Sequence, residues 1–196
     1  MTDIRELVAG ERSDLVEVLA GLPEEDWDKP SLSAGWRVRE VVAHITMAYR
    51  YSTPRVLLGI AKAGGSFNRF SDRAARADTA ALSNAELLGC LRDNINHPWK
   101  PPGGGYEGAL SHDVIHGLDM TVALGIDRQV PLERLRVVLG GLGPKHLKYF
   151  GVDLPNTELR ATDLDWSYGA GEVLTGTAQE LVLLVSGRDS SVRRGS

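Results

Sequence analysis

The chain has 196 residues, of which 42% are hydrophobic, and it carries a formal net charge of −4 at pH 7. This length and apolar fraction suit one compact domain, or one domain with a small appendage, and the absence of a basic face argues against nucleic acid as a partner. The single cysteine, Cys90, excludes an intrachain disulfide, and no apolar run approaches the roughly 20 residues that span a bilayer. We therefore expect a soluble, cytoplasmic protein without a signal peptide or a membrane partner.

Apolar residues at helical spacing predict five helices in the first three quarters of the chain. They are expected over residues 4–22, 37–63, 83–95, 107–124 and 131–142. Pro54 is expected to bend or break the second helix. Ser83 and Glu86 form a capping box at the start of the third helix. The polar stretch 64–80 and the Pro- and Gly-rich run 98–106 are predicted to be loops.

After Gly151 the pattern changes from helical to strand-like. Residues 159–168 have strand composition, GAG at 169–171 predicts a turn, and 172–175 predict a second short strand. Thr177 and Glu180 form another capping box, which opens a last helix. This segment is therefore expected to be a β-hairpin followed by a helix.

The elements together predict a mainly α protein in three parts. A helical bundle is expected over residues 1–150, a small α+β cap over 151–188 and a disordered tail over 189–196. Trp166 is expected to pack the cap onto the bundle, and a free strand edge of the cap could pair in a homodimer. We expect the cap to shape a substrate pocket and to contribute little to metal affinity.

Three histidines indicate where the chemistry of this chain lies. His112 and His116 are four residues apart in the fourth predicted helix, so both imidazoles lie on one helix face. Asp119 falls on the same face, and His44 lies in the second predicted helix. This spacing is typical of a metal site that keeps an open coordination position. The alternative is a buried hydrogen-bond network in which Asp119 is the partner.

The surroundings of the histidine pair favour a buried site. No Lys, Arg or Glu occurs from Ala109 to Gly125, although a helix side that faces solvent normally carries such residues. Buried imidazoles need partners, and either a metal or a carboxylate supplies one. His97 and His146 are interpreted as ordinary surface or hydrogen-bonded residues. No catalytic residue beyond the cluster is assigned.

Two motifs give the chain a family resemblance. GWRVREVVAH at residues 35–44 resembles the GW-x-V-x-(D/E)-V-x-A-H signature of the mycothiol-dependent maleylpyruvate isomerase family. That family belongs to the DinB/YfiT-like superfamily of metal-binding four-helix bundles. SHDVIHGLD at 111–119 and the segment 161–188 are also similar, so the resemblance covers most of the chain.

The resemblance implies a DinB-like four-helix bundle with a small C-terminal β-hairpin plus helix. It also implies a divalent metal held by His44, His112 and His116, with water or a thiol completing the coordination shell. Zinc is the expected ion, and nickel or another divalent metal stays open. In the isomerase the first position of the second motif is typically Glu, whereas this chain has His112. Three neutral ligands leave the ion its full charge and should make it a stronger Lewis acid.

The function implied is that of a metal-dependent transferase or isomerase that uses a low-molecular-weight thiol, mycothiol. Its partners would be this thiol and a small electrophilic substrate, and Asp119 would orient His116 from outside the ligand set. Two alternatives stay open at this stage. One is a metal-dependent hydrolase that uses metal-bound hydroxide, and the other is a non-catalytic metal- or ligand-binding module.

Overall fold

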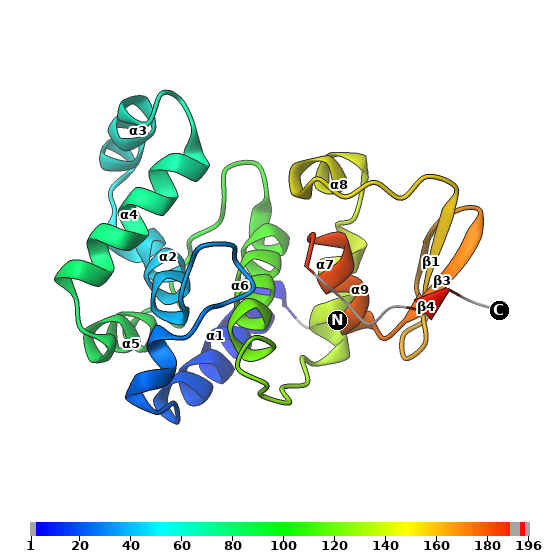
Figure 1. Cartoon of the computed structure of the whole chain (residues 1–196), viewed down its shortest axis with the longest axis horizontal. Coiled ribbons are helices and arrows are strands. Elements are labelled where there is room, and N and C mark those ends of the chain that lie inside the picture. Colours follow the sequence, from blue (N-terminus) through cyan, green and yellow to red (C-terminus); the bar gives the residue numbers. More distant parts are fainter. Residues whose placement is uncertain (1–2, 189–192, 195–196) are drawn as a thin grey trace.

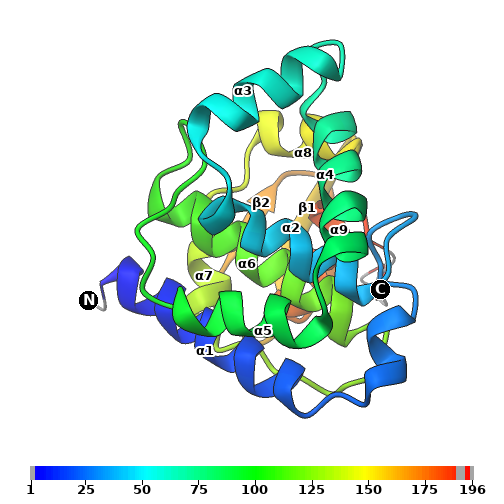
Figure 2. The same ribbon diagram turned by 90° about the vertical axis from the view of Figure 1, so that its left-hand side faces the viewer.

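Four helices form a bundle in the computed structural model, which describes residues 3–188 and 193–194. They are α1 (Ile4–Ala20), α2 (Val38–Arg50), α5 (Asn84–Asp93) and α6 (Gly105–Thr121). Both α1 and α2 pack against α5 and α6, as Figures 1 and 2 show. The prediction of a mainly α four-helix bundle is confirmed.

Apolar stripes at helical spacing drive this packing. Val38, Val41 and Val42 on α2 are fully buried and meet Leu15 of α1 and Leu87 of α5 in one cluster. Each buried Leu or Val contributes about 1.5–3 kcal/mol relative to an exposed one. The predicted capping box of α5 is present, since the Ser83 side chain accepts from the N–H of Glu86 and the Glu86 carboxylate accepts from the N–H of Ser83.

The segment after α2 agrees with the prediction in one respect and differs from it in another. The chain breaks near Pro54, as expected, and α3 (Thr53–Lys62) is a separate helix with no buried residue. The predicted loop 64–80 is instead mostly helical, because α4 spans Phe67–Ala81. Its many Arg and Asp residues hide a buried stripe of small side chains that packs on α2, namely Ser71, Ala74, Ala75, Asp78 and Thr79 together with Phe70.

Three further helices and one short turn of 3-10 helix complete the helical part. The 3-10 helix η1 (Glu24–Asp28) buries Trp27 beside α2. Helix α7 (Leu132–Gly140) packs on α6, and α9 (Ala178–Val185) packs on α7. The predicted capping box of Thr177 and Glu180 begins α9. The stretch that contains His146 forms the short helix α8 (Pro144–Phe150).

The C-terminal sheet is not the hairpin that the sequence predicted. The strands are β1 (Thr157–Ala161), β2 (Ser167–Gly169), β3 (Glu172–Gly176) and β4 (Arg193–Arg194), in the spatial order β2-β1-β3-β4. The pair β1–β2 is an antiparallel hairpin within residues 157–169, whereas β3 runs parallel to β1 on its other side.

The glycines of the GAG sequence explain this topology. They carry the chain across the start of β1 instead of turning it back beside β2. A Cβ at Gly169 would lie 2.3 Å from the carbonyl oxygen of Thr157, and one at Gly171 would lie 2.1 Å from that of Asn156. Both glycines also have positive φ, which other residues rarely adopt. A close crossing of this kind therefore requires glycine at both positions.

The cap and the bundle share one hydrophobic cluster. Leu159 of β1 and Leu181 of α9 are fully buried together with Leu110 and Leu118 of α6. Trp166 packs on the edge of the same cluster, as predicted. Within the described residues no helix is both long and apolar enough to cross a membrane. Most of the predicted tail 189–196 lies outside the described residues, and its Arg193–Arg194 pair with β3.

Candidate metal centre

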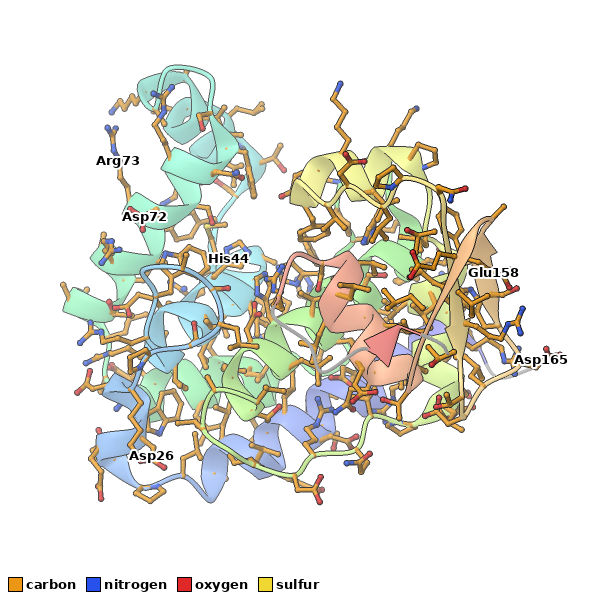
Figure 3. All side chains as sticks on the ribbon, turned by 45° about the vertical axis from the view of Figure 1, so that its right-hand side comes forward. Asp26, His44, Asp72, Arg73, Glu158 and Asp165 are labelled. Carbon is orange, nitrogen blue, oxygen red and sulfur yellow. The ribbon has the colours of Figure 1, made fainter. Side chains whose placement is uncertain are left out.

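The bundle brings the three predicted histidines together. His44 lies on α2, and His112 and His116 lie one turn apart on α6, which α2 contacts. The ring centroids are 4.7 to 5.1 Å apart, and one ring nitrogen from each histidine lies within 4.8 Å of the other two. Figure 3 shows His44 near the middle of the molecule, whereas Arg73 and Glu158 lie at its edges. His97 and His146 lie outside this cluster, as expected.

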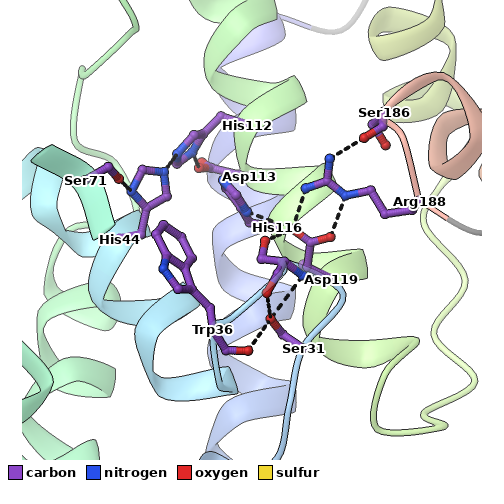
Figure 4. Close-up of polar contacts among 12 residues, drawn as sticks. Ser31, Trp36, His44, Ser71, His112, Asp113, His116, Asp119, Ser186 and Arg188 are labelled. Carbon is purple, nitrogen blue, oxygen red and sulfur yellow. Dashed lines mark hydrogen bonds and ion pairs between the residues drawn. The ribbon is translucent and has the colours of Figure 1, made fainter. Parts of the chain in front are cut away.

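Each imidazole of the cluster is held at its Nδ1 by a different side chain (Figure 4). The Oγ of Ser71, on α4, lies 2.8 Å from Nδ1 of His44. Asp113 Oδ1 lies 2.8 Å from Nδ1 of His112, and Asp119 Oδ2 lies 2.9 Å from Nδ1 of His116. An ionised carboxylate only accepts hydrogen bonds, so His112 and His116 carry their hydrogens on Nδ1. Their Nε2 atoms therefore present lone pairs.

Each of the two carboxylates also binds an arginine. Arg12 of α1 donates from Nε to Oδ2 of Asp113 over 2.8 Å, and both side chains are almost completely buried. Arg188, which follows α9, donates from Nε and Nη2 to the two oxygens of Asp119, each over 2.8 Å. The Ser33 hydroxyl donates a further hydrogen bond of 2.7 Å to Asp119. Two relays, each a chain of hydrogen bonds from a histidine through an aspartate to an arginine, thus converge on the cluster.

The relays fix the charge of the carboxylates. Burial alone would raise the pKa of Asp119, but hydrogen bonds from Arg188 and His116 outweigh this effect and hold the pKa well below its usual range. In Asp113 the opposing effects are burial and the contacts with His112 and Arg12, and the pKa is again lowered. Both carboxylates are therefore ionised at neutral pH and offset the charges of the two arginines.

Two of the imidazoles are neutral at neutral pH. Burial lowers the pKa of His44 well below 6.5, and the proximity of His116 and His112 lowers it further. Burial also lowers the pKa of His116, against the opposing hydrogen bond with Asp119. A neutral imidazole is the form that binds a metal ion. Because the side chains of His112 and His116 are 19% and 15% exposed, the cluster is open to solvent on the α6 side.

The arrangement fits a divalent ion. Nε2 of His44 and Nε2 of His112 are 3.2 Å apart. Two nitrogens that bind one tetrahedral zinc ion at about 2.0–2.1 Å lie roughly 3.3 Å apart, so the separation is already suitable. Two lone pairs at this distance repel unless a proton or a cation lies between them. The donor set, three imidazoles without a thiolate or a carboxylate, suits zinc, nickel or copper better than magnesium or calcium.

Two tryptophan side chains lie beside the histidine cluster. The ring of Trp36 lies 5.1 Å from that of His44 and 6.5 Å from that of His116. Its Nε1 donates to Asp72 over 2.9 Å, which fixes the indole plane. The ring of Trp99 lies 5.1 Å from that of His112. Both indoles are half-buried, so they border the cluster with apolar, flat surfaces.

The sequence did not point to several residues of the site. Ser71 falls in a segment predicted to be a loop, and Arg12 and Arg188 come from the two ends of the chain. Asp113 could have been found, because it is an acid in the stretch from Ala109 to Gly125, which contains no Lys, Arg or Glu. The cap was expected to contribute little to metal affinity. The contact of Arg188 with Asp119 was not part of that expectation.

The fold and the cluster define a DinB-like helical bundle with a three-histidine centre. Residues 8–97 match the sequence model of the family described as "Mycothiol maleylpyruvate isomerase N-terminal domain". This match supports the family that the motifs predicted, over slightly less than half of the chain. The matched region includes His44 and ends before His112 and His116.

Solved structures and relatives extend the likeness over nearly the whole chain. The crystal structure of the mycothiol-dependent maleylpyruvate isomerase covers 96% of this chain and 89% of its own, with a TM-score of 0.64 and 16% identity. A histidine-to-alanine mutant of that enzyme gives a TM-score of 0.65 with 15% identity, and covers 95% of this chain and 89% of its own. Among curated proteins, the uncharacterized protein Rv0036c of Mycobacterium tuberculosis strain H37Rv is 29% identical over 91% of this chain and 82% of its own length. These matches cover the cap as well as the bundle, so the shared fold includes both parts.

Proposed function

We propose that the protein is a metal-dependent enzyme that uses mycothiol to isomerise or transfer a small electrophilic substrate. The observation that carries this proposal is the convergence of three imidazoles whose Nδ1 atoms are all engaged. Nε2 of His44 and Nε2 of His112 lie 3.2 Å apart, and one ring nitrogen of each histidine lies within 4.8 Å of the other two. His44, His112 and His116 would hold the ion. When bound, it would supply a Lewis acid that favours the thiolate form of the thiol, which is the reactive form at neutral pH.

The charge balance of the site favours an anionic thiol and an anionic substrate. Asp113 pairs with Arg12 and Asp119 pairs with Arg188, so these four charges cancel. The three imidazoles add no charge when neutral, and a divalent ion would leave a net charge of about +2 at the centre. Such a site attracts a thiolate and an electrophile that bears a carboxylate.

The residues of this chain would orient the reactants and control the proton. Trp36 and Trp99 border the cluster and would limit how a flat substrate lies on it. With an ion bound, none of the three histidines retains a free nitrogen to accept the thiol proton, so that proton passes to the solvent. In an isomerisation the thiolate would add to one carbon of a conjugated double bond of the substrate, and the π electron pair would move to the conjugated carbonyl oxygen. When this pair returns, the C–S bond would break, the double bond would form again, and the thiol would regain its proton from the solvent.

Calorimetry with mycothiol tests the proposal. Titrations of zinc-loaded protein in two buffers of different ionisation enthalpy should show binding with proton release, because thiolate and not thiol is bound. Protein treated with a chelator should not bind the thiol, and zinc-loaded His146→Ala should behave like the parent.

Two other outcomes would assign a different function. Equal binding of mycothiol before and after chelation would contradict the proposal and favour a ligand-binding module. Turnover of an ester by the zinc-loaded protein without thiol would favour a hydrolase.

A further inference from the structure

Helix α3 and the first turns of α4 form an arm, residues 51–73, at the periphery of the molecule (Figures 1 and 2). Helix α3 packs against α4 and contains no buried residue. Three of the six large apolar side chains that are exposed among the described residues lie on this arm, namely Leu57, Leu58 and Phe67. Their exposed fractions are 63%, 57% and 44%, so the arm presents apolar surface that no part of the described chain covers.

The outer face of α3 combines apolar and cationic side chains. Arg55, Leu58 and Lys62 are three and four residues apart, so they share one face of the helix, and Leu57 is next to it. All four side chains are exposed. The opposite side of α3 packs toward α4 through Val56, Ile60 and Ala63.

A run of ring contacts connects Phe67 with Arg55 across the arm. The ring of Phe67 lies 6.2 Å from that of Phe70, and the ring of Phe70 lies 6.3 Å from that of Tyr51. The guanidinium of Arg55 lies 3.5 Å from the ring centre of Tyr51. The ring of Phe70 also leaves no room for a Cβ at Gly59, so α3 and α4 meet closely there. The exposed side chains of both helices are therefore held on one packed unit.

The arm is cationic in a chain that is acidic overall. Residues 51–71 contain three cations and no acid, whereas the whole chain has a net charge of −4. Arg69 donates to the carbonyl oxygen of Gly64 over 3.3 Å, and Arg73 donates to that of Lys62 over 3.5 Å. These guanidinium groups thus gather at the end of α3 without a carboxylate.

The cations of the arm keep their charge unpaired. Asp72 is the acid on the arm, and Arg76 already binds it over 2.9 Å. Within the described part of the chain, no ion pair involves the four arm cations, which are Arg55, Lys62, Arg69 and Arg73. The arm therefore offers apolar side chains beside four uncompensated positive charges.

We propose that this arm docks on the surface of an anionic lipid bilayer. Leu57, Leu58 and Phe67 enter the boundary between headgroups and acyl chains, and the arm cations bind the lipid phosphates. The acidic remainder of the chain is repelled by the same surface, so the arm is the part that faces it. The chain was expected to have no membrane partner, since no segment can span a bilayer, but contact with the surface of a bilayer requires no spanning segment.

Sedimentation with lipid vesicles tests this proposal on the full chain. The protein should bind saturably to vesicles of equal parts phosphatidylglycerol and phosphatidylcholine in about 0.1 M salt, and much more weakly to vesicles of phosphatidylcholine alone. Raising the salt to about 0.5 M should weaken binding, because salt screens the attraction between the arm and the lipid phosphates. Zinc-loaded and chelator-treated protein should bind alike, so this test is independent of the proposed function.

Two double variants separate the apolar and the cationic contributions. Arg55→Gln/Lys62→Gln should weaken binding about 20- to 30-fold, since each cation near an anionic surface contributes about fivefold. Leu57→Ser/Leu58→Ser should weaken it on the order of tenfold or more, because two apolar side chains no longer leave water. All four positions are exposed, so both variants should keep the urea unfolding curve of the parent.

The matched controls carry the same changes elsewhere on the surface. Leu132→Ser on α7 removes an exposed leucine, and Arg160→Gln on β1 removes an exposed arginine. Both should bind the anionic vesicles like the parent.

Four results would overturn the proposal. They are no binding to the anionic vesicles, equal binding to phosphatidylcholine alone, full binding by either double variant, and self-association of the parent without lipid that Leu57→Ser/Leu58→Ser abolishes. The last result, seen by sedimentation velocity, would assign the arm to a contact between two copies of the chain.

Discussion

Arg188 binds Asp119 through two hydrogen bonds of 2.8 Å, one to each carboxylate oxygen, across 69 residues of sequence. Asp119 is buried and in turn accepts from Nδ1 of His116. The residue that follows the last cap helix therefore fixes the orientation of a histidine in the bundle. This contact makes the cap part of the support of the candidate metal centre.

Replacement of Arg188 should weaken metal binding. We expect Arg188→Gln to lower zinc affinity about 10- to 100-fold, the usual effect of losing a group that orients a ligand. The measurement is competition with a chromophoric chelator. Arg160→Gln is the control, because Arg160 lies in the same cap but forms an exposed ion pair with Glu158. Equal affinities of Arg188→Gln and the parent would show that the cap does not support the centre.

The Nδ1 contacts of His44 and His116 should differ in their effect on metal affinity. Ser71→Ala removes a contact with a neutral hydroxyl, for which a net loss of about 0.5–1.5 kcal/mol, up to roughly tenfold in affinity, is expected. Asp119→Asn removes a charged acceptor and should cost more, about 10- to 100-fold. The same chelator competition ranks the two variants. A larger loss for Ser71→Ala than for Asp119→Asn would contradict the assigned roles.

The stability of the metal-free protein should depend on pH through His44 and His116. Burial lowers the pKa of both in the folded state, whereas the unfolded chain has the ordinary value of 6.5. The unfolded state therefore takes up protons first as the pH falls below about 6.5, and the free energy of unfolding decreases by up to about 1.4 kcal/mol per pH unit for each histidine. Urea unfolding in chelator at pH 7.5, 6.5 and 5.5 measures this slope. The double variant His44→Gln/His116→Gln should have a clearly shallower slope, and equal slopes would refute the explanation.

Two glycine substitutions should have opposite effects on stability. A Cβ at Gly117 on α6 would lie 2.8 Å from Leu15 Cδ2 and 2.9 Å from Arg128 Nη1, so α1 and α6 are too close there for a side chain. Gly117→Ala should lower the free energy of unfolding, because overpacking of about 1–3 kcal/mol exceeds the helix-propensity gain of about 0.8–1 kcal/mol. Gly89→Ala on α5 meets no atom within 4 Å and should be stabilising by up to about 1 kcal/mol. Urea unfolding compares both, and stabilisation by Gly117→Ala would show that the helices can separate.

The sequence was sufficient to predict the bundle and the histidine pair. His112 and His116 share a face because of helical periodicity, and the motif that ends at His44 placed the third ring on the facing helix. The capping boxes of α5 and α9 were also visible, since they depend on residues three positions apart. These features are local, so spacing along the chain determines them.

The remaining parts depend on contacts between distant segments. Helix α4 was missed because small residues such as Ala74 and Ala75 form its buried stripe, and a stripe of this kind is faint beside many Arg and Asp residues. Arg12 and Arg188 reach the site only through tertiary packing. The parallel pairing of β1 with β3 follows from the crossing at Gly169 and Gly171, which resembles a hairpin turn in sequence.

Metal analysis by mass spectrometry tests the central claim most directly. The protein should be purified without a histidine tag and without added metal, beside His116→Ala and the control His146→Ala. We predict about one equivalent of a divalent metal per chain, zinc foremost, in the parent and in His146→Ala, and none in His116→Ala. A parent protein that contains no metal and takes up none from a zinc solution, or a His116→Ala variant that keeps its full metal content, would contradict the proposal that the three histidines form a metal centre.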